Sequence, residues 1–465
     1  MLTDLKKPLL RPTVVMSTVF VASMFVSILD ATIVNVALPK ISEDLGVSPV
    51  DARSAVVGYL VSMAMVIPAS GWFGDRFGRK RVLLSALAAF TIASALCGLA
   101  DNLVELTVFR ILQGLGGGML GPVAMAMMFH VFPPDQRMRV SQIMVAPTAV
   151  APALGPVLGG LLVDKLSWRF VFYVNVPIGI CALLFGLFLL TEQRESSADR
   201  FDIAGFLLSC GGSGLLMFAL TEGATLGWTS PVIVASGLAG IALLVLLVVV
   251  ELRTPTPMLD LRLFADRMFR TVNVVTVLST ATFLGALFVF PLLYQNAIGA
   301  SALTTGLAAF PEAIGVMVGT QLAMRVHRAA GPRRHLALAL VNIAVGMALL
   351  GLIGQDTDPW LTRLIMFYLG LGMGNVLSVT RAAAFATLPP PKTGVASALF
   401  STSGQVGAAV GVALLGSVLA AVGTVTAAGQ PNLAAYHLAF FVAAALTLVG
   451  AGCALAIPDA PEPGS

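Results

Sequence analysis

Long apolar segments recur along almost the whole of this 465-residue chain. A helix needs ~20 residues to cross a hydrocarbon core of ~30 Å, and we count fourteen segments that reach this length. Charged residues make up only 11% of the chain, whereas soluble domains carry about 25%. Because backbone polar groups in lipid must be paired within the protein, the sequence predicts an all-α integral membrane protein with no room for a soluble catalytic domain.

The distribution of Lys and Arg predicts the orientation of these segments. With the N-terminus placed in the cytoplasm, most of the 27 basic residues fall in segments on the inside. Those on the outside are Lys40, Arg53, Lys165, Arg169 and Arg363. Because cytoplasmic loops are enriched in Lys and Arg, we expect both termini inside and an even number of spans. The net charge of +4 follows from this topology and indicates no nucleic-acid partner.

Tryptophans and cysteines give two smaller expectations. The four tryptophans, Trp72, Trp168, Trp228 and Trp360, fall at the ends of predicted spans, where an interfacial aromatic belt would place them. The four cysteines all lie inside apolar segments. They are interpreted as small core residues and not as disulfide partners or metal ligands.

Asp30 lies inside the first apolar segment. Its spacing from Ser23 and Ser27 places the three side chains on one helix face. A carboxylate in hydrocarbon is costly unless it meets water, a partner or a proton, and such acids are by default ion or substrate sites. The alternative is a packing acid tied to a neighbouring helix. We favour the functional interpretation.

A second polar cluster lies in the fourth predicted span. Arg110, Gln113, Gly114, Gly117 and Gly121 share one helix face. Small residues let another helix approach closely, and an arginine in a span needs an acid or a carbonyl partner. Asp30 is the candidate partner.

The short turn at residues 71–81 combines glycines, one acid and four bases. Glycines permit a tight turn, and Asp75 is placed to pair with Arg76, with Arg79 or with a helix end. Positive-inside charge alone would explain the arginines, but it explains neither the acid nor the spacing of Gly71 and Gly78.

The fifth predicted span, residues 140–163, contains three prolines and three glycines. Its central block holds Gly155, Pro156, Gly159 and Gly160. Prolines kink helices and glycines allow close approach, so this composition predicts a bent helix with one closely packed face.

Glu312 is the other carboxylate placed well inside a span, next to Pro311. The alternative is an acid near the outer interface that is wetted and inert; we favour a functional role. Amide side chains in the spans are candidates for lining a cavity or for bridging helices. They are Asn35, Gln113, Asn175, Asn273 and Gln405.

Four of these blocks together resemble the major facilitator superfamily, and most closely its fourteen-span drug:proton antiporters of the EmrB/QacA type. The blocks are L-D-x-T-I-V-N-V-A-L-P at Leu29–Pro39, G-x-x-x-D-R-x-G-R-K-R at Gly71–Arg81, R-x-x-Q-G-x-G-x-G starting at Arg110, and G-P-x-x-G-G at Gly155–Gly160. The last block resembles the family's antiporter motif.

The resemblance implies a major facilitator fold of two six-helix bundles with two extra helices between them. It places the N-terminal bundle at residues 1–195, the additional helices at 196–255 and the C-terminal bundle at 256–465. It also implies that the 71–81 turn latches the inner side during alternating access, and family members often carry an acid in the helix of Glu312.

The implied function is proton-coupled efflux of lipophilic, cationic compounds. Asp30, Glu312 and Arg110 would form the proton-coupling and substrate site. The expected partners are a small lipophilic substrate, protons and the lipid bilayer, with no cofactor and no metal. The chain lacks the G-x-x-x-x-G-K-[ST] phosphate loop. We expect a monomer in the bacterial cytoplasmic (inner) membrane.

Three other functions remain open at this stage. An exporter of an endogenous lipid, amino acid or other metabolite would have the same fold. A receptor or assembly protein would gain little from intramembrane charges that are costly to keep. An intramembrane enzyme would need a nucleophile–base pair or a metal cluster in the spans, and the sequence shows neither.

Overall fold

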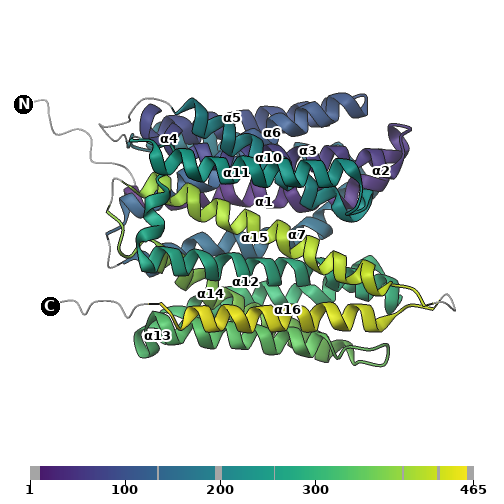
Figure 1. Ribbon diagram of the computed structural model, residues 1–465. Coiled ribbons are helices and arrows are strands. Elements are labelled where there is room, and N and C mark those ends of the chain that lie inside the picture. Colours follow the sequence, from purple (N-terminus) through teal and green to yellow (C-terminus); the bar gives the residue numbers. More distant parts are fainter. Residues whose placement is uncertain are drawn as a thin grey trace, which may run out of the picture. The chain divides into compact units, whose positions relative to one another are not determined.

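The computed structural model describes residues 11–133, 136–193, 202–255, 257–389, 392–426 and 430–457. These residues form helices joined by short turns (Figure 1). Apart from an isolated pairing of Val425 with Pro431, the described residues contain no β-structure. The all-α fold class is therefore confirmed.

The chain divides into two compact units, and the first comprises Met1–Leu215, Ala239–Leu261 and Leu388–Ser401. Its complete helical elements are α1 (Pro12–Asp44), α2 (Pro49–Ala52), α3 (Ser54–Val66), η1 (Ile67–Ala69), α4 (Ser70–Phe77), α5 (Arg79–Leu99), α6 (Leu103–Val131), α7 (Arg137–Lys165), α8 (Phe170–Tyr173) and α9 (Asn175–Leu189).

The second unit comprises Leu216–Leu238, Arg262–Thr387 and Thr402–Ser465. Its complete helices are α12 (Arg267–Leu292), η4 (Leu293–Ala297), α13 (Ala302–Leu350), α14 (Pro359–Ala384) and α16 (Leu433–Ala454). Four elements contribute residues to both units: α10 (Ile203–Leu226), α11 (Pro231–Arg253), η3 (Leu261–Ala265) and α15 (Thr393–Val422).

The number of membrane spans agrees with the sequence. Thirteen helices among the described residues are long and apolar enough to cross a membrane, and a bent pair in α7 makes up to fourteen. That pair, Met138–Pro152 and Val157–Lys165, is bent by 41°, as the prolines and glycines predict. In α13, Gly331 has a φ of 70° and separates the spans Thr304–His327 and Gly331–Leu350. A positive φ is readily available to glycine because it has no Cβ.

Polar side chains cap the N-termini of several helices. Asn102 accepts a hydrogen bond from the Glu105 N–H at the start of α6, and Asp266 accepts one from the Phe269 N–H at the start of α12. Asp358 does the same at the start of α14. These caps satisfy N–H groups that have no partner within the helix.

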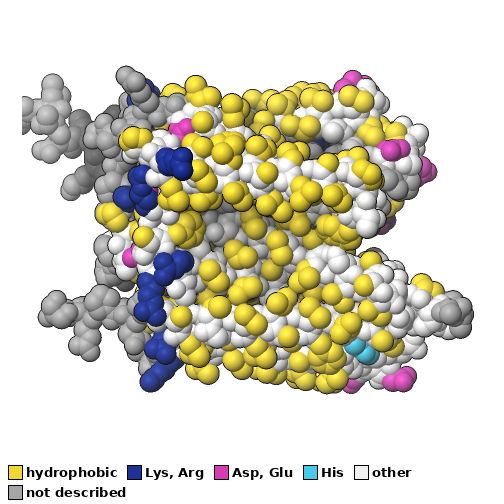
Figure 2. Space-filling model, viewed as in Figure 1, with side chains coloured by type: hydrophobic (Ala, Val, Ile, Leu, Met, Phe, Trp, Pro, Cys, Tyr) yellow, Lys and Arg dark blue, Asp and Glu magenta, His cyan; other side chains and the backbone are white. Residues whose placement is uncertain are grey.

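Many exposed side chains on the outer faces of the helices are apolar. Side chains such as Val104 and Phe188 are 74% and 77% exposed. Figure 2 shows hydrophobic side chains along the helices of each unit, with Lys and Arg gathered near helix ends. Exposed apolar surface on this scale fits helices that face lipid.

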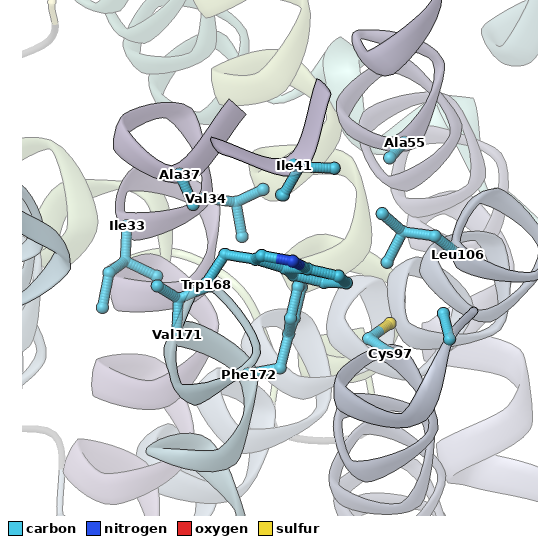
Figure 3. Close-up of a cluster of buried hydrophobic side chains, with 11 residues drawn as sticks. Ile33, Val34, Ala37, Ile41, Ala55, Cys97, Leu106, Trp168, Val171 and Phe172 are labelled. Carbon is cyan, nitrogen blue, oxygen red and sulfur yellow. The ribbon is translucent and has the colours of Figure 1, made fainter. Parts of the chain in front are cut away.

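An apolar cluster fills the space between α1, α3, α5, α6 and the α7–α8 turn (Figure 3). Its central side chain is Trp168, which is fully buried against Phe172. The expectation that all four tryptophans lie in an interfacial belt is therefore wrong for Trp168. The neighbouring Arg169 is not part of the apolar cluster. Its guanidinium carbon lies 4.5 Å from the centre of the Trp168 ring. The cluster also contains Ile33, Val34, Ala37 and Ile41, which follow Asp30 along α1.

Candidate functional site

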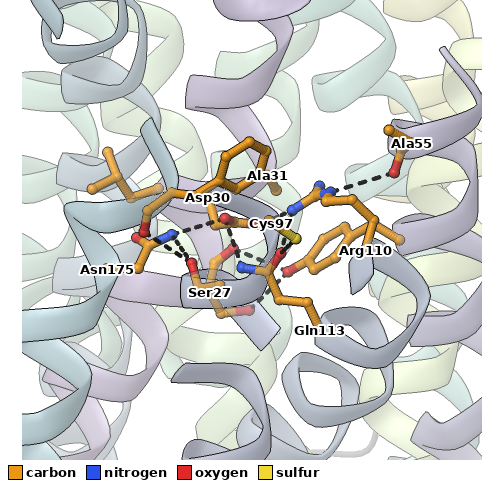
Figure 4. Close-up of polar contacts among 12 residues, drawn as sticks. Ser27, Asp30, Ala31, Ala55, Cys97, Arg110, Gln113 and Asn175 are labelled. Carbon is orange, nitrogen blue, oxygen red and sulfur yellow. Dashed lines mark hydrogen bonds and ion pairs between the residues drawn. The ribbon is translucent and has the colours of Figure 1, made fainter. Parts of the chain in front are cut away.

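The Asp30 carboxylate is fully buried and accepts hydrogen bonds on both oxygens (Figure 4). Its Oδ2 accepts from Arg110 Nη1 at 2.5 Å, and its Oδ1 accepts from Gln113 Nε2 at 2.9 Å. Asn175 Nδ2 donates to the same Oδ1 at 2.8 Å. The sequence placed these four residues in three different spans, and the structure brings them together.

Arg110 is 1% exposed and has partners besides Asp30. Its Nη1 donates to Gln113 Oε1 at 2.8 Å, and its Nε donates to the Ala55 carbonyl at 3.3 Å. The guanidinium carbon lies 4.1 Å from the centre of the Tyr59 ring and 5.7 Å from that of Phe172. The buried positive charge is thus matched by one carboxylate, two neutral acceptors and two aromatic rings.

A second layer of contacts fixes these side chains. Asn175 Nδ2 also donates to Ser94 Oγ at 3.1 Å, and Ser94 Oγ donates to the Phe172 carbonyl at 2.9 Å. The Cys97 thiol donates weakly to Gln113 Oε1 at 3.6 Å. Ser94, Cys97, Tyr59 and Phe172 were not among the residues that sequence reasoning selected.

The face of α1 that carries Asp30 is buried as predicted. Ser23 and Ser27 are 0% and 5% exposed, and Ser27 contacts the Tyr59 hydroxyl. Along α1 the apolar cluster of Figure 3 begins three residues beyond Asp30. The carboxylate is therefore closed off on this side by packed side chains.

The charges of Asp30 and Arg110 depend on each other. A buried ion pair whose partners are both hydrogen-bonded is tolerated, but removing one charge leaves the other uncompensated at a large cost. A proton on Asp30 Oδ2 would take the place of the Arg110 contact, while Oδ1 could keep its two amide donors. Its arrival would loosen the hold of the carboxylate on the Arg110 guanidinium.

Glu312 lies in α13, in the second unit, and is partly buried. Among the described residues its carboxylate has no hydrogen-bond or salt-bridge partner. The backbone around it is closely packed, because a Cβ on Gly370 of α14 would collide with the Glu312 carbonyl.

The other amide candidates lie outside the Asp30 cluster. Asn35 is exposed and donates to the Ala31 carbonyl at 3.1 Å. Asn273 is buried in α12 and donates to the Phe269 carbonyl at 2.8 Å. Gln405 in α15 is partly buried, and no hydrogen bond of its side chain is found within the described part of the chain.

The turn predicted at residues 71–81 is confined to Gly78, because α4 continues to Phe77 and α5 begins at Arg79. Ion pairs and close backbone contacts hold this 71–81 segment. Asp75 Oδ1 accepts from Arg79 Nη2 at 2.8 Å. A Cβ on Gly71 would lie 2.7 Å from the Gly394 carbonyl, near the start of α15, and one on Gly394 would lie 2.7 Å from Asp75 Oδ2. Asp75 therefore pairs with Arg79 and lies beside a helix start, two of the partners that the sequence suggested. Arg76 is exposed.

Glu192, three residues beyond the end of α9, is an additional partner of this segment. Its Oε1 accepts from the Lys80 N–H at 3.0 Å, and a Cβ on Gly78 would lie 2.6 Å from that oxygen. Gly78 has a φ of 97°, so a side chain here would be strained as well as crowded.

The glycines of α7 differ in their surroundings. A Cβ on Gly155 would collide with Thr32 of α1, and one on Gly159 would lie 3.0 Å from Ile33 Cγ1. Nothing lies within 4 Å of the corresponding position on Gly160. The closely packed face therefore includes Gly155 and Gly159 but not Gly160. The Pro156 side chain lies outside the described residues.

No group of three or more His, Cys, Asp or Glu able to hold a metal ion is found among the described residues.

Comparisons with known proteins agree with this architecture. The family model of the Major Facilitator Superfamily matches residues 20–412 and 272–465. The putative multidrug resistance protein MdtD of Pectobacterium atrosepticum is 32% identical over 414 residues, covering 88% of this chain and 87% of its own. The tetracenomycin C resistance and export protein of Streptomyces glaucescens is 32% identical over 411 residues, covering 88% and 76%.

A solved structure matches the fold over almost the whole length. The crystal structure of the human organic anion transporter MFSD10 (TETRAN) aligns with a TM-score of 0.69 and covers 96% of this chain and 99% of its own, at 15% sequence identity. The family model and the bacterial multidrug resistance relatives confirm the resemblance found in the motifs, and the chain belongs to the Major Facilitator Superfamily.

Proposed function

We propose that this membrane transporter exports lipophilic cations in exchange for protons. The observation that carries the proposal is the buried Asp30 carboxylate, paired with Arg110 and held by Gln113 and Asn175. Such a costly group needs a reason to be retained, and reversible protonation supplies one. The names of the bacterial relatives, which refer to multidrug resistance and to export, support small-molecule efflux.

Asp30 and Glu312 alternate between an ionised and a protonated form in this mechanism. Ionised, they attract a cationic cargo. A proton entering from the outer side neutralises them, removes the attraction and lets the cargo leave. At Asp30 the same proton breaks the contact with Arg110, so cargo release is tied to a change in the contacts between α1 and α6.

The proton gradient provides enough energy for this exchange. A proton moving down 100 mV yields ~2.3 kcal/mol, and each pH unit adds ~1.4 kcal/mol. Exchange of one monovalent cation for one proton moves no net charge, so only the pH difference would drive it. A second proton, for which Glu312 is available, would let the voltage contribute.

Alternating access by movement of two bundles is the expected transport cycle for this fold. The Gly71–Arg81 turn would act as the inner latch, because Asp75 holds Arg79 and lies beside the start of α15. We place the protein in the bacterial cytoplasmic membrane as a monomer, with both termini in the cytoplasm.

The test uses purified protein in sealed vesicles that are loaded at acid pH and contain a pH-sensitive dye. A panel of lipophilic cations, neutral lipophilic compounds and anions is added outside. We expect the cations to accelerate proton loss from the vesicles. Proton loss triggered by a neutral lipid or an amino acid, and not by the cations, would replace this proposal with metabolite export.

A further inference from the structure

Protonation of Asp30 leaves the Arg110 guanidinium without its counter-charge. The inference below rests on that step of the proposed function. Arg110 cannot reach water without moving, because it is 1% exposed in the middle of α6. Its other hydrogen-bond acceptors are the Ala55 carbonyl at 3.3 Å and Gln113 Oε1 at 2.8 Å, and both are neutral.

Two aromatic rings also attract the positive charge, and that of Tyr59 is the nearer. Its centre lies 4.1 Å from the guanidinium carbon, well inside the ~6 Å range of cation–π contacts. The ring is itself fixed to α1, because the Tyr59 hydroxyl donates to the Ser27 carbonyl at 3.3 Å. Phe172 offers a second face at 5.7 Å, a weaker contact.

The ring acts differently on the two protonation states. Its negatively polarised face attracts Arg110 in both states, but while Asp30 is ionised the carboxylate holds the guanidinium and offsets much of its positive charge. Once Asp30 is neutral, the guanidinium keeps its full positive charge and the Tyr59 ring still attracts it. We propose that Tyr59 is a positioning residue that holds the Arg110 guanidinium on its ring face while Asp30 carries a proton.

Among the described residues, few other charged or titratable groups face this pair. They are Tyr59 itself on α3 and the Cys97 thiol on α5. The packed elements α8 and α9 contribute the neutral Phe172 and Asn175. The charged residues of α7 lie near its ends, at Arg137, Arg139, Asp164 and Lys165. A change in the titration of Asp30 on altering Tyr59 can therefore be assigned to the ring.

The measurement is the infrared band of protonated carboxyl groups as the pH of the purified, full-length protein is lowered. The component lost in Asp30→Asn identifies Asp30. In Tyr59→Leu we expect half-protonation of Asp30 to move to more acid pH by up to about one unit, because the ring stabilises the guanidinium more in the protonated state and only that difference is lost. Tyr59→Phe keeps the ring and should titrate close to the unaltered protein.

A fluorinated phenylalanine series at position 59 gives a second measurement that keeps the shape of the site. Each added fluorine weakens the negative face of the ring, so half-protonation should move stepwise to more acid pH. The control is Tyr436→Leu, since Tyr436 is equally buried but lies in α16 of the second unit. It should leave the Asp30 band unchanged.

Three results would overturn the role of Tyr59: a flat fluorine series, a Tyr59→Leu protein that titrates like the unaltered one, or a Tyr59→Phe shift as large as that of Tyr59→Leu. Because the titration needs no cargo, it separates this inference from the transport proposal. If cations move no protons in vesicles but the fluorine series is graded, the transport proposal fails and the role of Tyr59 stands.

Discussion

Three side chains donate hydrogen bonds to the Asp30 carboxylate and fix its position. Gln113 has a double role, because it donates to Asp30 and accepts from Arg110. Hydrogen bonds to charged groups contribute ~1.5–3 kcal/mol each, and leaving a buried partner unsatisfied costs a similar amount. The geometry of the ion pair therefore depends on a neutral side chain as much as on the two charges.

Replacing Gln113 by Leu should lower stability by roughly 2–4 kcal/mol, since two bonds to charged groups are lost. The measurement is the thermal unfolding midpoint of purified protein in detergent. The matched control is Gln405→Leu, because the Gln405 amide makes no hydrogen bond within the described residues. Equal falls in the midpoint for both variants would contradict the proposed role of Gln113.

Four members of this cluster could be predicted from the sequence, and four could not. Asp30, Arg110, Gln113 and Asn175 stand out because strongly polar side chains are rare in spans. Tyr59, Ser94, Cys97 and Phe172 are ordinary residues in apolar helices. Hydroxyls there usually bond their own helix, as Thr91 does to Leu87, whereas Ser94 reaches the Phe172 carbonyl. Only the packing of the helices distinguishes the two cases.

At the scale of helices, the contact between α1 and α7 depends on two glycines. Gly155 faces Thr32, whose hydroxyl is held by the Leu29 carbonyl at 2.9 Å. Thr32 lies two residues from Asp30, so the packing of α7 directly supports the helix that carries the carboxylate. The Thr32 side chain cannot move aside without losing this hydrogen bond to its own helix.

Alanine at Gly155 should therefore destabilise the protein by roughly 1–3 kcal/mol, the usual cost of overpacking, and should slow transport. Gly160→Ala is the matched control, because its added Cβ meets nothing within 4 Å. Unfolding midpoints and cation-driven proton flux in vesicles would be compared. A Gly155→Ala protein indistinguishable from Gly160→Ala would show that the two helices do not need this close contact.

The bend of α7 followed from its prolines and glycines, but the difference between Gly155 and Gly160 did not. Both belong to one short motif. Which glycine faces a neighbour depends on the rotation of the helix about its axis, and a bend alters that rotation. A sequence pattern without strong amphipathicity does not specify it.

At the scale of the whole molecule, hydropathy was sufficient for the span count and the fold class. The division of the chain into compact units was harder to predict from the sequence. Residues of α10 and α11 are shared between the two compact units, so the three-part division at residues 195 and 255 stays a prediction. Contacts between distant segments, which decide such divisions, have no local signal in the sequence.

The orientation in the membrane yields a direct prediction. In a background without native cysteines, Asp356→Cys should react with a membrane-impermeant maleimide added to intact cells, and Arg333→Cys should react only after the cells are opened. Both positions are exposed, and they lie at opposite ends of the span Gly331–Leu350 and its following turn. Labelling in the reverse order would invert the topology that the basic residues predict.

The claim on which the transport account depends is that Asp30 carries the coupling proton. Its most direct test is the release of protons when a lipophilic cation binds to the purified protein in weakly buffered solution. Measurements on the unaltered protein, on Asp30→Asn and on Glu312→Gln would be compared, with cation binding followed separately.

We predict that cation binding releases protons from the unaltered protein, that Asp30→Asn removes most of this release, and that Glu312→Gln removes the remainder. Full proton release from Asp30→Asn, with the cation still bound, would contradict the account. It would make the Asp30–Arg110 pair a structural tie between α1 and α6.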